Sequence, residues 1–348
     1  MEARHKGAAG SAVRWALAAA VVMITLLYVP APYVVLQPGL VESAAPLVRS
    51  SAEPDNAGAA GEWMITTVYM NRRINFWTAA QSMWRSDREA YSESKFLRGR
   101  SIREYSARMV VLMEDSQSQA IEAAYNQLGI GYELLPDSLV VAGTAGKRSG
   151  FEPGDRITGV NGEPAASGEA LLELLRQGYG SGAAELAVDV ERNGAAAEIA
   201  VRAPEKAANA ASGTAAQLLP TLLGGVELIE RRKIRAFDPA HAVSIEAGDV
   251  GGPSAGLVFA LQIVDRLTPG DMAQGRRIAA TGTIAPSGMV GEIGGVGLKV
   301  IAAHRAKADL LIVPEGNVKE AEAKAEDIGA GFDIIGVSTL DEAIRAVR

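Results

Sequence analysis

The chain has 348 residues, 48% of them hydrophobic and 22% charged, which is typical of a globular protein with room for two modest domains. A net charge of −7 without any basic block argues against a nucleic-acid partner. The absence of cysteine excludes disulfides and thiol catalysis, and the three histidines lack metal-ligand spacing, so we expect no metal or other cofactor.

The N-terminal part combines basic side chains with an apolar run. Basic residues up to Arg14 precede an apolar stretch over 15–35, and about 20 apolar residues can span a bilayer as a helix. The positive-inside rule then predicts a cytoplasmic segment 1–14, a retained single-pass anchor over 15–35 in the cell membrane, and a remainder outside the cytoplasm. A cleaved signal peptide is the alternative. Residues 36–60, rich in Ala, Ser and Pro, are expected to form a tether.

The first folded segment is expected to cover residues 61–128. Its β-branched residues predict a strand over Trp63–Met70. Ser101 and Glu104 form a capping-box pattern at the start of a helix that continues to Leu128. Apolar residues recur along that helix at helical spacing, which predicts core packing.

Residues 129–203 are expected to form a compact, β-rich unit with small helices. Asn161-Gly162 and Asn193-Gly194 are tight-turn signals between strands, and Glu169–Gln177 has an amphipathic helical pattern. This order resembles the PDZ domains of bacterial proteases, which implies binding of extended peptides or C-termini at a sheet edge. By that resemblance the carboxylate-binding loop falls on Leu128-Gly129-Ile130-Gly131. A unit that acts only as a spacer is the alternative.

A serine follows in a glycine-rich turn. Residues 204–216 are rich in Ala, Ser and Asn and are expected to form a linker. The segment 248–256 then presents Ser254, and a mostly buried helix is predicted over Ala255–Leu267. Ser254 would thus lie at a helix N-terminus, where free N–H groups and the helix dipole favour the oxyanion of an acyl-transfer transition state.

The candidate base for this serine is a lysine. A serine hydroxyl is a weak nucleophile until a base takes its proton. Lys299 lies at the start of a helix predicted over Leu298–Ala306. A lysine acts as a base only when its pKa falls towards neutrality, which the apolar neighbours Val296, Leu298 and Val300 favour.

Four sequence blocks in the C-terminal part extend this pattern. They are Gly252-Pro253-Ser254-Ala255-Gly256, Thr281-Gly282, Ile293-Gly294-Gly295 leading to Lys299, and Leu311-Ile312-Val313-Pro314. In this order they resemble the proteolytic domain of Lon proteases, from about His241 to the C-terminus. The resemblance implies a catalytic Ser254–Lys299 dyad, with Thr281 supporting the lysine. It also implies that Gly252, Pro253 and Ala255 shape the oxyanion turn, and that Asp249 matches the acidic residue before the serine.

The resemblance further implies a fold and a set of partners. We expect an α/β (α+β) Lon-type proteolytic domain built from residues 61–128 and 217–348, with the PDZ domain inserted. The sequence shows no nucleotide-binding motif, so we expect ATP-independent cleavage of extended peptides or exposed protein segments. Neither a nucleotide nor a nucleic acid is expected as a partner. A homo-oligomer is left open.

Two other functions are also left open by the residues. One is a PDZ-bearing adaptor without catalytic activity. The other is an esterase, because Gly252-x-Ser254-x-Gly256 fits the nucleophile-elbow pattern, with His304 downstream as the base and Asp265 or Asp271 as the acid. That fold needs a buried hydrophobic strand directly before the serine, whereas residues 248–252 are polar and glycine-rich.

Overall fold

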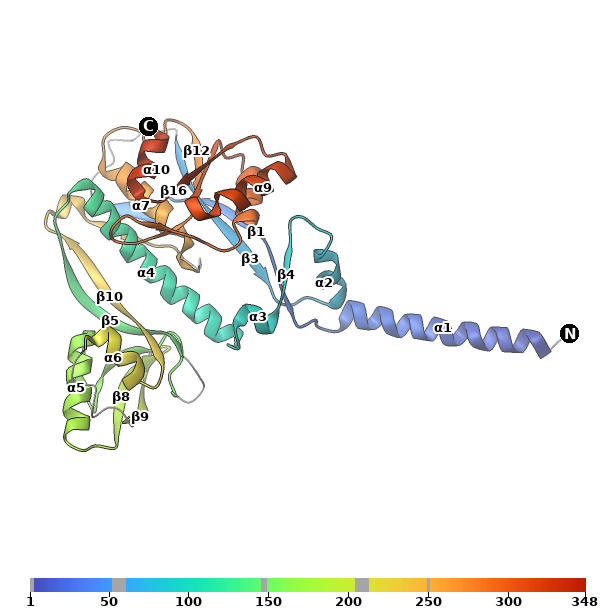
Figure 1. Cartoon of the computed structure of the whole chain (residues 1–348), viewed down its shortest axis with the longest axis horizontal. Helices are drawn as coiled ribbons and strands as arrows, with labels where there is room; N and C mark the ends of the chain where they lie inside the picture. The colour runs from blue at the N-terminus through green and yellow to red at the C-terminus, as the bar shows by residue number, and fades with distance from the viewer. Residues whose placement is uncertain (1–2, 52–60, 145–148, 204–212, 249–250) are drawn as a thin grey trace. The chain divides into compact units, whose positions relative to one another are not determined.

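The computed structural model describes residues 3–51, 61–144, 149–203, 213–248 and 251–348 (Figure 1). The described residues fall into two units. Residues 3–40 and 67–100 belong to the first unit, and residues 41–66 and 101–348 to the second.

The first unit combines helices with one antiparallel strand pair. Residues 33–36 pair with residues 89–92, and a small core contains Ala31, Val35 and Ile74. The elements of this unit are α1 (Ala3–Tyr28), most of β1 (Tyr33–Ser43), α2 (Phe76–Ser82), β4 (Glu89–Ser92) and α3 (Glu93–Leu97).

The predicted anchor over 15–35 is wrong in its extent. Helix α1 ends at Tyr28, and strand β1 begins at Tyr33. Pro30 and Pro32 lie between the two elements, and proline interrupts helices because it lacks an N–H and restricts the residue before it. In the part of the chain that the structure describes, no helix combines the length and the apolar character needed to span a bilayer.

The larger core of the second unit is built on parallel strands. They run in the order β16 (Asp333–Val337), β15 (Leu310–Pro314), β12 (Arg277–Ala280) and β3 (Glu62–Asn71). All five residues of β15 are buried, as expected for a strand covered on both faces. The sequence of β15 is therefore a continuous apolar run instead of an alternating pattern.

Helices cover both faces of these strands. Trp63, Ile278 and Ile312 pack with one group of helices, whereas the alternate residues Met64 and Ala279 pack with the other. The first group is α4 (Ile102–Leu128), α7 (Gly256–Leu267) and α10 (Leu340–Val347), and the second is α8 (Val296–Arg305) and α9 (Val318–Ile328). Two short antiparallel pairs flank this core: β2 (Val48–Ser50) with β11 (Val243–Ile245), and β13 (Thr283–Ile284) with β14 (Val290–Gly291).

A second, antiparallel sheet carries its own core. Its strands run in the order β10 (Val226–Ala236), β5 (Tyr132–Thr144), β6 (Arg156–Val160), β8 (Glu185–Arg192) and β9 (Ala195–Arg202), with β7 (Glu163–Pro164) paired to β6. Helices α5 (Gly168–Gly180) and α6 (Ala215–Leu222) contribute to this core. Asn161 and Asn193 have positive φ values of 52°, so both predicted Asn-Gly turns are formed.

The structure adds two elements to the compact unit predicted over 129–203. Ala215, Leu219 and Val226 are buried in the same core as β5 and β8, although they lie beyond the predicted boundary. Strand β10 pairs with β5 from Val226 to Ala236, and Ile234 near its end packs against the larger core. The long β5–β10 ladder therefore connects the two cores.

Candidate active site

Ser254 lies in a tight turn before a buried helix. Gly252 has φ 90°, a conformation that favours glycine, and Pro253–Ala255 form a 3-10 turn that leads into α7. Helix α7 begins at Gly256, one residue later than predicted, because the 3-10 turn takes up Ala255. Ser254 is half-buried, whereas Ala255 after it is buried. The turn thus leaves the serine accessible at the end of a rigid element.

Backbone and side-chain donors hold this turn on two sides. The Gly252 N–H donates to the Met109 carbonyl of α4 at 2.8 Å, and the Ser116 hydroxyl donates to the Pro253 carbonyl at 3.0 Å. On the other side, the Gly282 N–H donates to the Ser254 carbonyl at 2.9 Å. The peptide groups around the serine are therefore fixed by α4 and by the segment that follows β12.

Lys299 reaches the serine from the first turn of α8. Its Nζ lies 2.7 Å from Ser254 Oγ and 2.7 Å from Thr281 Oγ1. The Thr281 hydroxyl donates to the Ser254 carbonyl at 3.1 Å, so its oxygen can accept a hydrogen from the amine. When the amine is neutral, this arrangement leaves its lone pair free to accept the Ser254 proton.

Burial changes the acidity of this lysine. Lys299 is 3% exposed, and the residues around it on α8 are buried. Desolvation disfavours the charged amine and lowers the pKa of Lys299 from 10.5 to about 7. A substantial fraction of the amine is therefore neutral near pH 7, which is the protonation state that a general base needs.

The remaining residues predicted for the catalytic site have different positions. Thr281 is fully buried and contacts both members of the Ser254–Lys299 pair. Asp249 lies outside the described residues. His304 is exposed on α8 and contacts the ring of Phe332, with ring centroids 6.4 Å apart.

The two aspartates considered as the acid of an esterase triad form hydrogen bonds with other groups. Asp265 accepts hydrogen bonds from Trp63 Nε1 and from the Met272 N–H, and Asp271 accepts from the Gly61 N–H. Among the described side chains, the base within hydrogen-bond reach of Ser254 is Lys299. The observed arrangement is therefore a serine–lysine pair and not a serine–histidine–aspartate triad.

The residues predicted to form the carboxylate-binding loop lie at the C-terminal end of α4. Gly129 ends α4 in the left-handed conformation with φ 67°, and the Ile130 N–H donates to the Tyr125 carbonyl. Leu128 and Ile130 pack against the larger core. Gly131 accepts a hydrogen bond from the Phe237 N–H. These four residues thus cap α4 and lead into β5, and the role in peptide binding stays a prediction for them.

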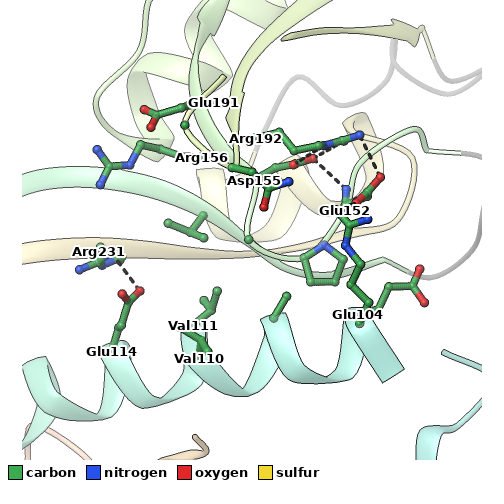
Figure 2. Close-up of a pocket in the computed structure, with 17 residues that line it drawn as sticks. Glu104, Val110, Val111, Glu114, Glu152, Asp155, Arg156, Glu191, Arg192 and Arg231 are labelled. Atoms are coloured by element: carbon green, nitrogen blue, oxygen red, sulfur yellow. Dashed lines mark hydrogen bonds and ion pairs between the residues drawn. The ribbon is translucent and has the colours of Figure 1, made fainter. Parts of the chain in front are cut away.

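A cavity of about 590 Å³ lies between α4 and the second sheet (Figure 2). Figure 2 shows Val110 and Val111 of α4 pointing towards its opposite wall, which includes Val140. The ion pairs Arg231–Glu114 at 3.0 Å and Arg192–Asp155 at 2.6 Å also line the cavity. The cavity therefore combines an apolar floor with charges of both signs.

Sequence reasoning missed the contribution of α4 to the serine turn. The apolar stripe of this helix predicted core packing, and Met113 and Ala120 are indeed in the larger core. Met109 and Ser116, however, bond to residues 137 or more positions later in the chain. The local sequence signal was a polar serine between apolar residues of the stripe, which by itself does not identify a partner.

Comparison with known proteins identifies two domains. Residues 209–347 match the family model of the Lon protease (S16) C-terminal proteolytic domain, and residues 137–192 match that of the PDZ domain. Relatives include "Lon protease homolog 2, peroxisomal" of Danio rerio, 34% identical over 35% of this chain and 14% of the relative. Another is "Lon protease 1" of Bacillus subtilis (strain 168), 39% identical over 27% of this chain and 12% of the relative. The matched part therefore spans about one seventh of the relatives' length, and the chain carries a Lon-type proteolytic domain and a PDZ domain.

Proposed function

We propose that this protein is a serine endopeptidase in which Ser254 is the nucleophile and Lys299 is the general base. The observation that carries the proposal is the 2.7 Å contact between the buried Lys299 amine and the Ser254 hydroxyl. The lowered pKa of Lys299 supports it, because a neutral amine can accept the proton. The match of residues 209–347 to a Lon proteolytic domain supports the same chemistry.

The proposed mechanism has two half-reactions. Ser254 Oγ attacks the scissile carbonyl carbon while its proton moves to Lys299 Nζ, which gives a tetrahedral oxyanion. The C–N bond then breaks, Lys299 returns the proton to the leaving amine, and an acyl-enzyme remains. A water molecule, deprotonated by Lys299, attacks this ester and releases the second product and Ser254. Thr281 keeps the amine directed at the serine through its bond to Lys299 Nζ.

The proposal includes ATP-independent cleavage of polypeptides that are already extended. The steps above use only side chains of this chain and water. A PDZ domain supports binding of peptide segments, and the cavity beside α4 offers an apolar floor for such a segment. Val110 in that floor follows Met109 on α4, and the Met109 carbonyl holds the serine turn, so one helix contributes both to the cavity and to the support of Ser254. The location at a membrane, outside the cytoplasm, stays a prediction that fractionation of cells would test.

The direct test is hydrolysis of an unfolded protein substrate by Ser254→Ala and Lys299→Met. Both variants should lose at least about 1,000-fold in kcat/KM while their thermal unfolding remains cooperative, because neither retains a nucleophile–base pair. A fluorophosphonate probe should label the wild-type protein at Ser254 and leave Ser254→Ala unlabelled. Wild-type activity in Lys299→Met would contradict the role of the lysine. An unlabelled, inactive wild-type protein would instead indicate an adaptor.

A further inference from the structure

Ser116 makes an unusual bond for a serine within a helix. A mid-helix serine commonly points to solvent or bonds back to the carbonyl four residues earlier. Ser116 is 2% exposed and donates instead to the Pro253 carbonyl, 137 residues later in the chain. Its hydroxyl thus connects the middle of α4 to the residue before the serine nucleophile of the proposed function.

The close approach of α4 and α7 fixes the position of this hydroxyl. A Cβ atom placed on Gly256 would lie 2.7 Å from Ser116 Oγ, so a side chain at position 256 would collide with the hydroxyl. Glycine at position 256 therefore leaves the space that Ser116 occupies. The Gly256 N–H also donates to the Pro253 carbonyl, so this oxygen accepts from two directions.

The orientation of the Pro253 carbonyl determines the orientation of a neighbouring donor. The Pro253 C=O and the Ser254 N–H belong to one peptide group, which is planar and has its C=O and N–H on opposite sides when trans, as it is here. Holding the carbonyl towards α4 therefore directs the Ser254 N–H away from α4. Ser254 lies in the 3-10 turn that leads into α7, and the first N–H groups of a helix lack acceptors within the helix.

We propose that Ser116 is a positioning residue that orients the Ser254 N–H as an oxyanion donor, an inference that rests on the proposed endopeptidase function. A donor fixed before the reaction stabilises the tetrahedral oxyanion without reorganisation in the transition state. Ser116 itself does not touch the substrate. Its contribution is made only in the transition state, so its loss lowers kcat and leaves substrate binding unchanged.

The test compares three single substitutions on α4. Ser116→Ala removes the hydroxyl, and Ser116→Cys replaces it with a group of similar size that donates hydrogen bonds weakly. Ser118→Ala is the matched control, because the Ser118 hydroxyl bonds within α4 to the Glu114 carbonyl at 3.5 Å. We expect kcat for peptide hydrolysis to fall about tenfold or more in both Ser116 variants, with KM unchanged. The Ser118→Ala variant should match the wild-type protein.

Inhibition by a peptide aldehyde provides the second readout. The aldehyde carbonyl adds to Ser254 Oγ and forms a tetrahedral adduct whose oxygen occupies the oxyanion position. Its affinity should fall in parallel with kcat in both Ser116 variants, while Ser118→Ala binds it as the wild-type protein does. Unchanged kcat and aldehyde affinity in Ser116→Ala, or full recovery in Ser116→Cys, would overturn the inference. An inactive wild-type protein would instead remove the proposed function and this inference with it.

Discussion

At the scale of single residues, the chemistry depends on where Lys299 holds its proton. The amine is 3% exposed and contacts two hydroxyl groups, at 2.7 Å each. Hydroxyl groups can stabilise either protonation state, so burial is what lowers the pKa of Lys299 to about 7. Thr281 accepts one hydrogen of the amine, and this contact favours a lone pair directed at Ser254.

The pH dependence of cleavage follows from this pKa. Only the neutral amine can accept the Ser254 proton, so kcat/KM should rise with pH through about 7 and level off above it. The measurement is kcat/KM for a peptide that has no titrating group between about pH 5.5 and about pH 9. Lys299→Arg is the control, since a guanidinium keeps its proton over this range and should be inactive throughout. A flat profile for the wild-type protein would contradict a neutral-lysine mechanism.

At the scale of elements, α4 takes part in two different surfaces. One side of the helix bonds to the serine turn through Met109 and Ser116. Another side lines the cavity with Ala107, Val110 and Val111. The same helix, α4, therefore lines the cavity and holds the serine turn.

A substitution in the cavity floor tests whether the substrate binds there. Val110 is 52% exposed, and Val110→Arg would place a longer, charged side chain at the apolar floor of the cavity. We expect KM for an unfolded protein substrate to rise about tenfold, because the variant loses a partly buried apolar contact with the substrate. The kcat for a short peptide should be unchanged. Ser106→Arg is the control, because Ser106 is exposed on the same helix and is not among the residues that line the cavity. Equal KM values for both variants and the wild-type protein would exclude this binding site.

Sequence patterns predicted those elements whose causes are local. The capping box of Ser101 and Glu104 is formed, as are both Asn-Gly turns. The pairing of Ser254 with Lys299 followed from a serine and a lysine in the order of a known family, and the structure brings them into contact.

The differences have non-local causes. In the apolar run over 15–35, only two prolines distinguish the last residues from a continuing helix. The strand that begins at Tyr33 forms by pairing with residues 89–92, which lie more than 50 positions later in the chain. Residues 204–216 are predicted as a linker and residues 217–348 as the proteolytic domain, so this boundary divides α6, which covers Ala215–Leu222. Its burial depends on contacts with the second core. The sequence pattern assigns Ser116 no role, because its partner, Pro253, lies far along the chain.

At the scale of the whole molecule, the proposed active site carries a cost in stability. Lys299 is buried in the second unit, where its pKa is about 7. In the unfolded chain its pKa is that of an ordinary lysine, 10.5. Between these values the unfolded chain binds one proton that the folded protein does not. The free energy of unfolding therefore rises with pH from about 7 to 10.5, and the contribution of Lys299 is constant below pH 7.

Lys299→Met should remove this pH dependence. Methionine fills a similar volume without a titrating group, so the variant should be more stable than the wild-type protein, most clearly at or below pH 7. The difference should shrink by about 1.4 kcal/mol per pH unit as the pH rises from 7 towards 10, the slope for one proton. Urea unfolding of both proteins at several pH values measures it, and other titrating groups cancel because both chains share them. Parallel stability curves would mean that the folded protein keeps Lys299 charged, which would also remove the base from the proposed mechanism.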